Sequence, residues 1–167
     1  MSTPTHESKA ELVEAIGDAT QVSNAYVVHI CSDERVYGSG FVVAVTKAFG
    51  NEPRNTHLRR RTYELGDVDF IEVKDGVTVC NMIAQHGLKS WRNPKPVDYV
   101  KLKEALAKVA DHILESKKAR VVHMPRIGCD RGGGKWSEVR PLIEETLIAA
   151  DIHVTVWTLP RSAPCGE

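Results

Sequence analysis

The 167-residue sequence predicts an α/β fold in which a mixed central sheet is flanked by helices. In the second half of the chain, apolar strand-like runs alternate with amphipathic helix-like runs, as in folds whose helices cover a largely buried sheet. Between residues 68 and 84, two apolar runs are joined by Asp75 and Gly76, a strong signal for an antiparallel hairpin. The sheet is therefore expected to be mixed rather than purely parallel.

The first half of the chain contains two predicted strands and one predicted helix. Residues 11–16 (ELVEAI) alternate between polar and apolar side chains, whereas residues 25–31 (AYVVHIC) are almost entirely apolar, as in a buried strand. Residues 37–50 (YGSGFVVAVTKAFG) begin with glycines and continue with apolar side chains at helical spacing, and Gly50 suits a helix end. A glycine-bearing loop thus follows the second strand.

The second half of the chain continues with helix, strand, helix and strand. Residues 97–116 (VDYVKLKEALAKVADHILES) are amphipathic, with Asp98 near the expected start of the helix. A strand is predicted at 119–124 (ARVVHM), a helix at 136–150 (WSEVRPLIEETLIAA) and a last strand at 153–159 (HVTVWTL). A second glycine-bearing loop, residues 125–135, lies between the strand at 119–124 and the helix at 136–150.

The length indicates one domain, and the charge balance does not indicate a strongly charged partner. We expect a single domain at residues 11–159, with flexible tails at 1–10 and 160–167. The 22 basic and 22 acidic residues balance, so bulk charge does not favour a nucleic acid or a membrane as partner. Two basic runs, HLRRR at 57–61 and SKKAR at 116–120, are interpreted as solvated faces.

The cysteines favour a reduced setting. Cys31 and Cys80 lie in apolar strand-like runs and are interpreted as small core residues. The chain has no CxxC pair and no Cys/His cluster with zinc spacing, so no metal site and no cofactor are expected.

The first residues lack the apolar core of a signal peptide, and no apolar run approaches membrane-spanning length. We therefore expect a cytoplasmic monomer with no membrane partner.

The two glycine-bearing loops, CSDERVYGSG at 31–40 and PRIGCDRGGGK at 125–135, follow predicted strands. Ligands of open α/β sheets bind beyond the carboxyl ends of strands, and backbone N–H groups at a helix start favour anions. The second loop is therefore predicted to be a phosphate cradle. It is not a Walker A loop, because Cys129 replaces the first glycine and Trp136, not a hydroxyl residue, follows Lys135. Tight strand-to-helix turns are the alternative interpretation.

Residues 16–159 resemble the macrodomain family, especially its branch with terminal ADP-ribose protein glycohydrolases and ADP-ribose 1''-phosphate phosphatases. The resemblance lies in the order and spacing of IGDAT, HICSDERVYGSGFVVAVTKAFG, CNMIAQ, MPRIGCDRGGGKWSEVRPLIEE and VTVWTL. It implies a three-layer macrodomain fold that binds ADP-ribose in a cleft across the sheet edge. The implied partners are ADP-ribose and ADP-ribosylated proteins, and a nucleic acid only as an ADP-ribosylated substrate.

The resemblance also assigns ligand-binding roles. Asp18 would accept a hydrogen bond from the adenine amino group, unless it only stabilises a turn, and Trp157 would form a wall beside adenine, unless it only packs in the core. Residues 38–40 match the loop that wraps the distal ribose, and residues 127–134 match the loop whose backbone N–H groups hold the pyrophosphate. The predicted ligand-binding set is Asp18, Ala19, Ser32, Gly38, Ser39, Gly40, Ile127, Gly128, Cys129, Arg131, Gly132, Gly133, Gly134 and Trp157.

The sequence departs from the family at three functional positions. Most macrodomains carry Asn-Ala-Asn after the second strand, where this chain has Cys-Ser-Asp, so Ser32 or Asp33 would replace the contact of the second Asn with the distal ribose, unless the loop follows a different path. The nucleophilic lysine of the human-type glycohydrolases matches Gln85, which cannot form a Schiff base, and their catalytic aspartate matches Gly132. The lysine–aspartate mechanism is therefore not expected here.

The catalytic candidates are Asp130, Asp33 and His29. We predict that the protein hydrolyses ADP-ribose from acidic side chains of modified proteins, with Asp130 activating a water that attacks the anomeric carbon. One alternative is a reader module that only binds ADP-ribose. A second is an ADP-ribose 1''-phosphate phosphatase, because His29 matches a histidine implicated in such relatives, although a buried core histidine is the simpler interpretation of a histidine in an apolar strand.

Overall fold

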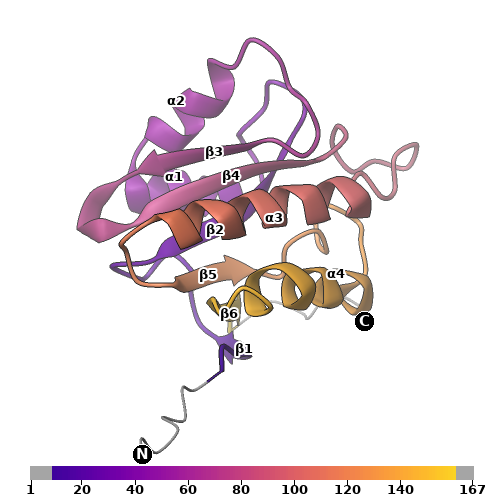
Figure 1. The fold of residues 1–167 in the computed structure, drawn as a ribbon. Coiled ribbons are helices and arrows are strands. Elements are labelled where there is room, and N and C mark those ends of the chain that lie inside the picture. Colours follow the sequence, from indigo (N-terminus) through magenta and orange to yellow (C-terminus); the bar gives the residue numbers. More distant parts are fainter. Residues whose placement is uncertain (1–8, 161–167) are drawn as a thin grey trace, which may run out of the picture.

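The computed structural model describes residues 9–160 and has three layers (Figure 1). The middle layer is a six-stranded sheet in the order β1-β6-β5-β2-β4-β3, with α1 and α2 on one side and α3 and α4 on the other. The strands are β1 (Leu12–Ile16), β2 (Tyr26–Ser32), β3 (Val68–Glu72), β4 (Thr78–Gln85), β5 (Val121–Pro125) and β6 (His153–Thr158). The helices are α1 (Phe41–Phe49), α2 (Glu52–Leu58), α3 (Tyr99–Glu115) and α4 (Trp136–Ile143), which continues as the π-helical η2 (Glu144–Ile148). The predicted three-layer α/β fold is confirmed.

Among the strands of residues 9–160, only β3 runs antiparallel to its neighbour. It pairs with β4, and the two are joined by the 3-10 turn η1 (Lys74–Gly76), in which Asp75 and Gly76 adopt φ of 57° and 70°. The predicted hairpin is thus confirmed, with both residues in the left-handed region that such turns require. Every other pair in the sheet is parallel, so the carboxyl ends of β1, β6, β5, β2 and β4 lie at one edge.

The main core lies between the sheet and helices α3 and α4. All eight residues of β4 are buried, as expected for a central strand covered on both faces. Helix α3 begins where the Asp98 side chain accepts a hydrogen bond from the Lys101 amide at 3.0 Å, which caps the first turn. The apolar face of α3 is fully buried at Leu102, Ala105, Leu106, Val109 and Ile113.

The sequence did not reveal α2, and it misplaced part of the basic run at 57–61. His57 is fully buried at the end of α2, where its Nε2 lies 3.1 Å from the Glu34 carbonyl oxygen. Arg60 is largely buried and pairs with Asp67 at 2.8 Å and Asp69 at 2.5 Å. The interpretation of this run as a solvated face is therefore wrong for both residues.

Most of the predicted tails, 1–10 and 160–167, and Cys165 lie outside the described residues. Ala10 is described and buried, and its amide donates to the Asp151 carboxylate at 3.1 Å. Cys31 and Cys80 are buried free thiols in β2 and β4, as predicted, and Cys129 is buried as well. Within residues 9–160, no helix has the length and apolar character needed to cross a membrane.

The glycine loop after β5 is fastened to the segment that leads into α3. The Val97 amide donates to the Gly132 carbonyl at 3.1 Å, and the Lys135 amide donates to the Tyr99 hydroxyl at 3.0 Å. Gly133 has a φ of 68°, and a Cβ added there would collide with the Pro94 carbonyl oxygen. The glycine at this position is thus required by packing as well as by backbone conformation.

We predict that Gly133→Ala lowers the free energy of unfolding by about 2 kcal/mol or more, because it combines a disfavoured backbone conformation with a steric clash. Urea denaturation of the two proteins measures the difference. Gly38→Ala is the matched control: an added Cβ there meets nothing within 4 Å, so the change should stay within about 1 kcal/mol. A Gly133→Ala protein as stable as the wild type would contradict this account of the loop.

Candidate functional site

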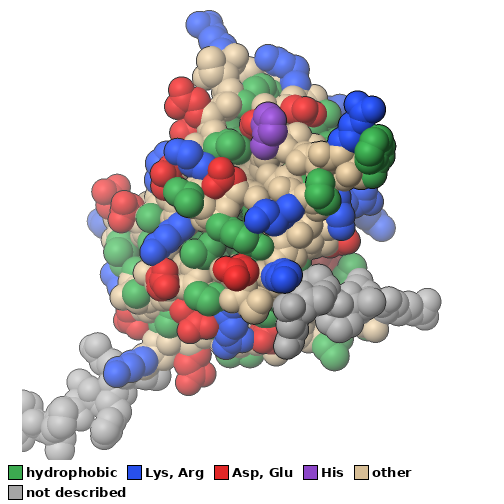
Figure 2. Space-filling view, turned by 90° about the vertical axis from the view of Figure 1, so that its right-hand side faces the viewer, with side chains coloured by type: hydrophobic (Ala, Val, Ile, Leu, Met, Phe, Trp, Pro, Cys, Tyr) green, Lys and Arg blue, Asp and Glu red, His purple; other side chains and the backbone are tan. Residues whose placement is uncertain are grey.

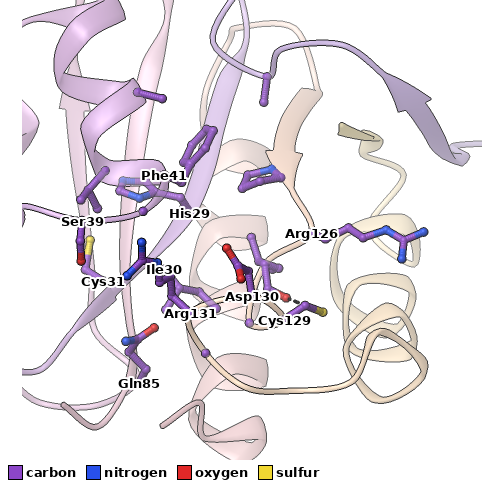
Figure 3. Close-up of a pocket in the computed structure, with 18 of the residues that line it drawn as sticks. His29, Ile30, Cys31, Ser39, Phe41, Gln85, Arg126, Cys129, Asp130 and Arg131 are labelled. Atoms are coloured by element: carbon purple, nitrogen blue, oxygen red, sulfur yellow. Dashed lines mark hydrogen bonds between the residues drawn. The ribbon is translucent and has the colours of Figure 1, made fainter. Parts of the chain in front are cut away.

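A cleft of about 850 Å³ opens at the edge where the parallel strands end (Figure 3). Its position follows from the pairing of β2 with β5, which is limited to Tyr26 with Val122 and Val27 with His123. Beyond these residues the two strands no longer pair, and the loops that follow them form opposite walls of the cleft. The volume suits a ligand of nucleotide size, and the position is the usual one for ligands of open α/β sheets.

One end of the cleft is formed by the loop after β1 and by the end of β6. Asp18 Oδ1 accepts hydrogen bonds from the Thr20 amide at 2.8 Å and the Thr20 hydroxyl at 2.7 Å. Its Oδ2 has no hydrogen-bond partner within the described part of the chain. Asp18 therefore stabilises a turn, and it also presents a carboxylate oxygen at this end of the cleft.

Trp157 lies beside Asp18 on the same wall. Its indole packs so closely on Gly17 that an added Cβ there would lie 2.6 Å from the ring. The indole N–H donates to His123 Nδ1 at 2.9 Å, and burial lowers the pKa of His123, which keeps it a neutral acceptor. Trp157 is thus held in a fixed orientation along the cleft wall.

The loops at 38–40 and 127–132 face each other across the middle of the cleft. Asp130 and Arg131 project into it, whereas the Cys129 sulfur turns away toward the Ile127 carbonyl oxygen at 3.6 Å (Figure 3). Arg131 spans the gap, because its Cγ lies 3.2 Å from the position of a Cβ added to Gly40. Arg131 thus brings a guanidinium to the loop at 38–40, which suits a phosphate-bearing ligand.

The structure brings most predicted site residues to this cleft, but not Gly133, Gly134 or Asp33. Gly133 packs under residues 94–95, and the Gly134 amide donates to the Gly128 carbonyl at 2.7 Å, so it is not directed at a ligand. The predicted residues on the lining are Asp18, Ala19, His29, Ser32, Gly38, Ser39, Gly40, Ile127, Gly128, Cys129, Asp130, Arg131, Gly132 and Trp157.

Asp33 is engaged by the loop that follows β4. Its carboxylate accepts a hydrogen bond from the Gly87 amide at 2.9 Å and pairs with His86 Nδ1 at 2.7 Å. The hydrogen bond to Asp33 raises the pKa of the exposed His86 above its ordinary value. Asp33 therefore fastens one loop to another, which leaves Asp130 as the predicted catalytic carboxylate that lies on the cleft.

His29 belongs to a buried polar network below the cleft. The Asn81 side-chain amide donates to the Pro53 carbonyl at 3.0 Å, so its Oδ1 is the acceptor for Tyr37 at 3.0 Å and for His29 Nε2 at 2.6 Å. His29 is 1% exposed, and burial lowers its pKa to about 4. It is therefore neutral at physiological pH, with its proton on Nε2.

The other end of the cleft is formed by residues that the sequence analysis did not single out as ligand-binding. Gln85, Leu88 and Lys89 line it from the end of β4 and the loop beyond, and the cleft lining also includes Tyr37, in the loop before α1, and Phe41, the first residue of α1. Gln85, Leu88 and Lys89 could have been found from the position of β4. A strand parallel to β2 must end at the same edge of the sheet, so the loop that follows it must reach the site. Within residues 9–160, no group of three His, Cys, Asp or Glu side chains is placed to hold a metal ion.

A mixed sheet with a cleft between two glycine loops at its carboxyl edge defines a ligand-binding α/β domain. No family model matches the sequence. The chain is 30% identical over 133 residues to the ADP-ribose glycohydrolase OARD1 of Bos taurus, over 80% of this chain and 81% of that protein. It is 36% identical to a macrodomain protein from Streptomyces coelicolor, with a TM-score of 0.74 over 89% of this chain and 99% of that one.

The macrodomain of Mycobacterium tuberculosis DarG shares the fold at 19% identity, with a TM-score of 0.72 over 89% of this chain and 97% of that one. The curated relative and the Streptomyces structure show the family more directly, because they combine higher identity with coverage of most of both chains. The protein belongs to the macrodomain family.

We predict that the protein loses stability as the pH falls from about 6.5 to about 4. The folded-state pKa of His29, about 4, lies below its ordinary value of 6.5, so the unfolded chain binds more protons in this interval. The neutral, buried His29 makes its full contribution to the free energy of unfolding above pH 6.5. This contribution is lost as the pH falls through the interval, and it amounts to about 3 kcal/mol for a pKa shift of this size.

An NMR titration of His29 measures this pKa directly, and urea unfolding at several pH values measures its effect on stability. His29→Gln should weaken the pH dependence without abolishing it, because burial also lowers the pKa of His57 and His123. Titration of His29 near pH 6.5 would contradict the buried neutral state.

Proposed function

We propose that the protein binds ADP-ribose along this cleft and hydrolyses it from acidic side chains of modified proteins. The observation that carries the proposal is the meeting of two glycine loops across one cleft, bridged by Arg131 and ending at Asp18. The likeness to a protein named ADP-ribose glycohydrolase supports the same ligand.

ADP-ribose would lie with its adenine at the end of the cleft formed by β1 and β6. There Asp18 Oδ2 would accept a hydrogen bond from the adenine amino group, and the fixed indole of Trp157 would cover the ring. The loop at 127–132 and the Arg131 guanidinium would hold the pyrophosphate. The distal ribose would then lie between residues 38–40 and Gln85, where β2 and β4 end.

Asp130 would act as the general base. Its exposed carboxylate on the cleft would take a proton from a water, whose oxygen forms a bond to the anomeric carbon of the distal ribose. The bond between that carbon and the ester oxygen breaks, and the modified glutamate or aspartate leaves as a free carboxylate. Gln85 and Ser32, neighbours in the pairing of β4 with β2, would orient the ribose hydroxyls.

A reader module is the second candidate function. It is favoured by Gln85 and Gly132, which stand at the positions of the lysine and aspartate in the human-type glycohydrolases. A phosphatase is less well supported, because His29 is neutral and almost completely buried. The enzyme and the reader differ in one measurable respect, which is the release of ADP-ribose from a modified protein.

We predict that Asp130→Ala lowers the turnover of a glutamate-linked ADP-ribosylated protein by about 10²–10⁴-fold, the usual contribution of one general base. Binding of free ADP-ribose, with a Kd in the micromolar range or about −8 kcal/mol, should change by less than about threefold, because other residues hold the ligand. Release of free ADP-ribose and isothermal titration measure the two effects.

Glu138→Ala is the matched control. Glu138 is an exposed carboxylate in the first turn of α4 and does not line the cleft, so both turnover and binding should match those of the wild type. A wild-type protein that binds ADP-ribose and releases none would establish the reader. A fully active Asp130→Ala variant would contradict the role of Asp130.

A further inference from the structure

The loop that follows β4, residues 86–96, is an ordered projection. Ser90 and Asn93 exchange backbone hydrogen bonds of 3.1 Å in both directions, which leaves Trp91 and Arg92 at the tip of a tight turn. The Asn93 side-chain amide donates to the carbonyl oxygens of His86 at 2.8 Å and Leu88 at 3.1 Å. These bonds, together with the contacts of Asp33 to the base of the loop, hold the tip in one shape.

The tip exposes large apolar side chains and cations without acidic partners. Trp91 is 84% exposed and Leu88 is 45% exposed. The Arg92 guanidinium lies 4.9 Å from the centre of the Trp91 ring, and the Lys95 ammonium lies 4.7 Å from that of Tyr99. Arg92, Lys95 and Lys89 form no ion pair within residues 9–160, in contrast to Lys101, Lys103, Lys108 and Lys118.

Figure 2 views the side of the molecule on which this loop lies. It shows Lys and Arg side chains grouped with hydrophobic side chains at one edge of that face. An ordered loop with an exposed indole, a leucine and unpaired cations has the composition of a binding surface, since Trp and Arg dominate the energetics of protein interfaces.

The loop also lies where a modified protein would leave the cleft. Leu88 and Lys89 line the cleft beside Gln85, whereas Asp18 and Trp157 line it at the end formed by β1 and β6. In the sheet, β5 and β2 lie between β6 and β4, so these two ends of the cleft are on opposite sides of it. If ADP-ribose lies as proposed above, its anomeric carbon is at the end where β4 stops, and the group attached to that carbon emerges next to this loop.

We propose that the tip, Leu88 to Lys95, binds the segment of the modified protein that flanks the ADP-ribosylated residue, and that this segment is acidic and carries an apolar side chain. The inference rests on the proposed function and names the substrate that the same site prefers. Unpaired Lys89, Arg92 and Lys95 complement an acidic segment, and Trp91 with Leu88 offers an apolar contact.

A polynucleotide fits the same surface less well. Single strands bind to a continuous basic groove in which bases stack on aromatic rings. Here one face of Trp91 is already covered by Arg92, and carboxylates of Asp33 and Glu34 lie at the base of the loop. A phosphate backbone, with a charge at every nucleotide, would meet these carboxylates, whereas an acidic peptide carries its charges at separate positions.

The test uses the Asp130→Ala protein, so that the substrate is not consumed. Its probe is a synthetic peptide with one ADP-ribosylated glutamate flanked by glutamates and a leucine. Adding Trp91→Ala and Arg92→Ala should weaken binding of this peptide by about 10- to 100-fold, as expected for interface residues of this kind. Binding of free ADP-ribose, measured by isothermal titration on the same proteins, should change by less than about twofold, because neither side chain lines the cleft.

The matched control adds Val43→Ala and Lys47→Ala instead, an exposed apolar residue and an exposed cation one turn apart on α1 that do not line the cleft. It should bind the peptide as the Asp130→Ala protein does. Equal peptide binding by the tip variant would overturn the inference, as would displacement of the peptide by an unmodified single-stranded oligonucleotide. Failure of all these proteins to bind free ADP-ribose would instead overturn the proposed function.

Discussion

The early separation of β2 from β5 is the constraint on which the rest of the site depends. The two strands pair over only two residues each, so each continues toward its carboxyl end without the other as partner. The glycine loops that follow them become opposite walls, and Arg131 reaches across to Gly40. A fuller pairing would bring together the loops that follow the two strands, and these loops line the cleft. The cleft is thus a consequence of sheet register, and the glycines allow its walls to approach closely.

This arrangement requires polar groups to be buried beneath the cleft. His29, Tyr37 and Asn81 share hydrogen bonds there, and the Pro53 carbonyl completes the network from the start of α2. Because a buried polar group without a partner is costly, the network ties α2 to the wall of the cleft. The depressed pKa of His29 has the same origin, since burial disfavours its charged form. The short helix α2 therefore contributes to the site although none of its residues lines it.

Local sequence patterns were sufficient for the sheet, the hairpin at Asp75 and Gly76, and the longer helices, because each has a clear period or turn signal. They were not sufficient for α2, whose seven residues have no apolar period and whose buried His57 bonds through Nε2 to a carbonyl 23 residues away. The same limit applies within the site. Asp33 is engaged by residues more than 50 positions further along the chain, and Gly133 by the segment before α3. Which side chains face the cleft was decided by such distant contacts, whereas the edge of the sheet at which it lies could be predicted from the glycine loops that follow two of the strands.

The central claim is that one cleft holds ADP-ribose lengthwise, from Asp18 to the end of β4. A crystal structure of the complex with ADP-ribose tests it most directly. The account predicts adenine within hydrogen-bond distance of Asp18 Oδ2 and beside Trp157, the pyrophosphate between residues 127–132 and Arg131, and the anomeric carbon nearest Gln85 and Asp130. A ligand in the reverse orientation, or one bound outside this cleft, would contradict it.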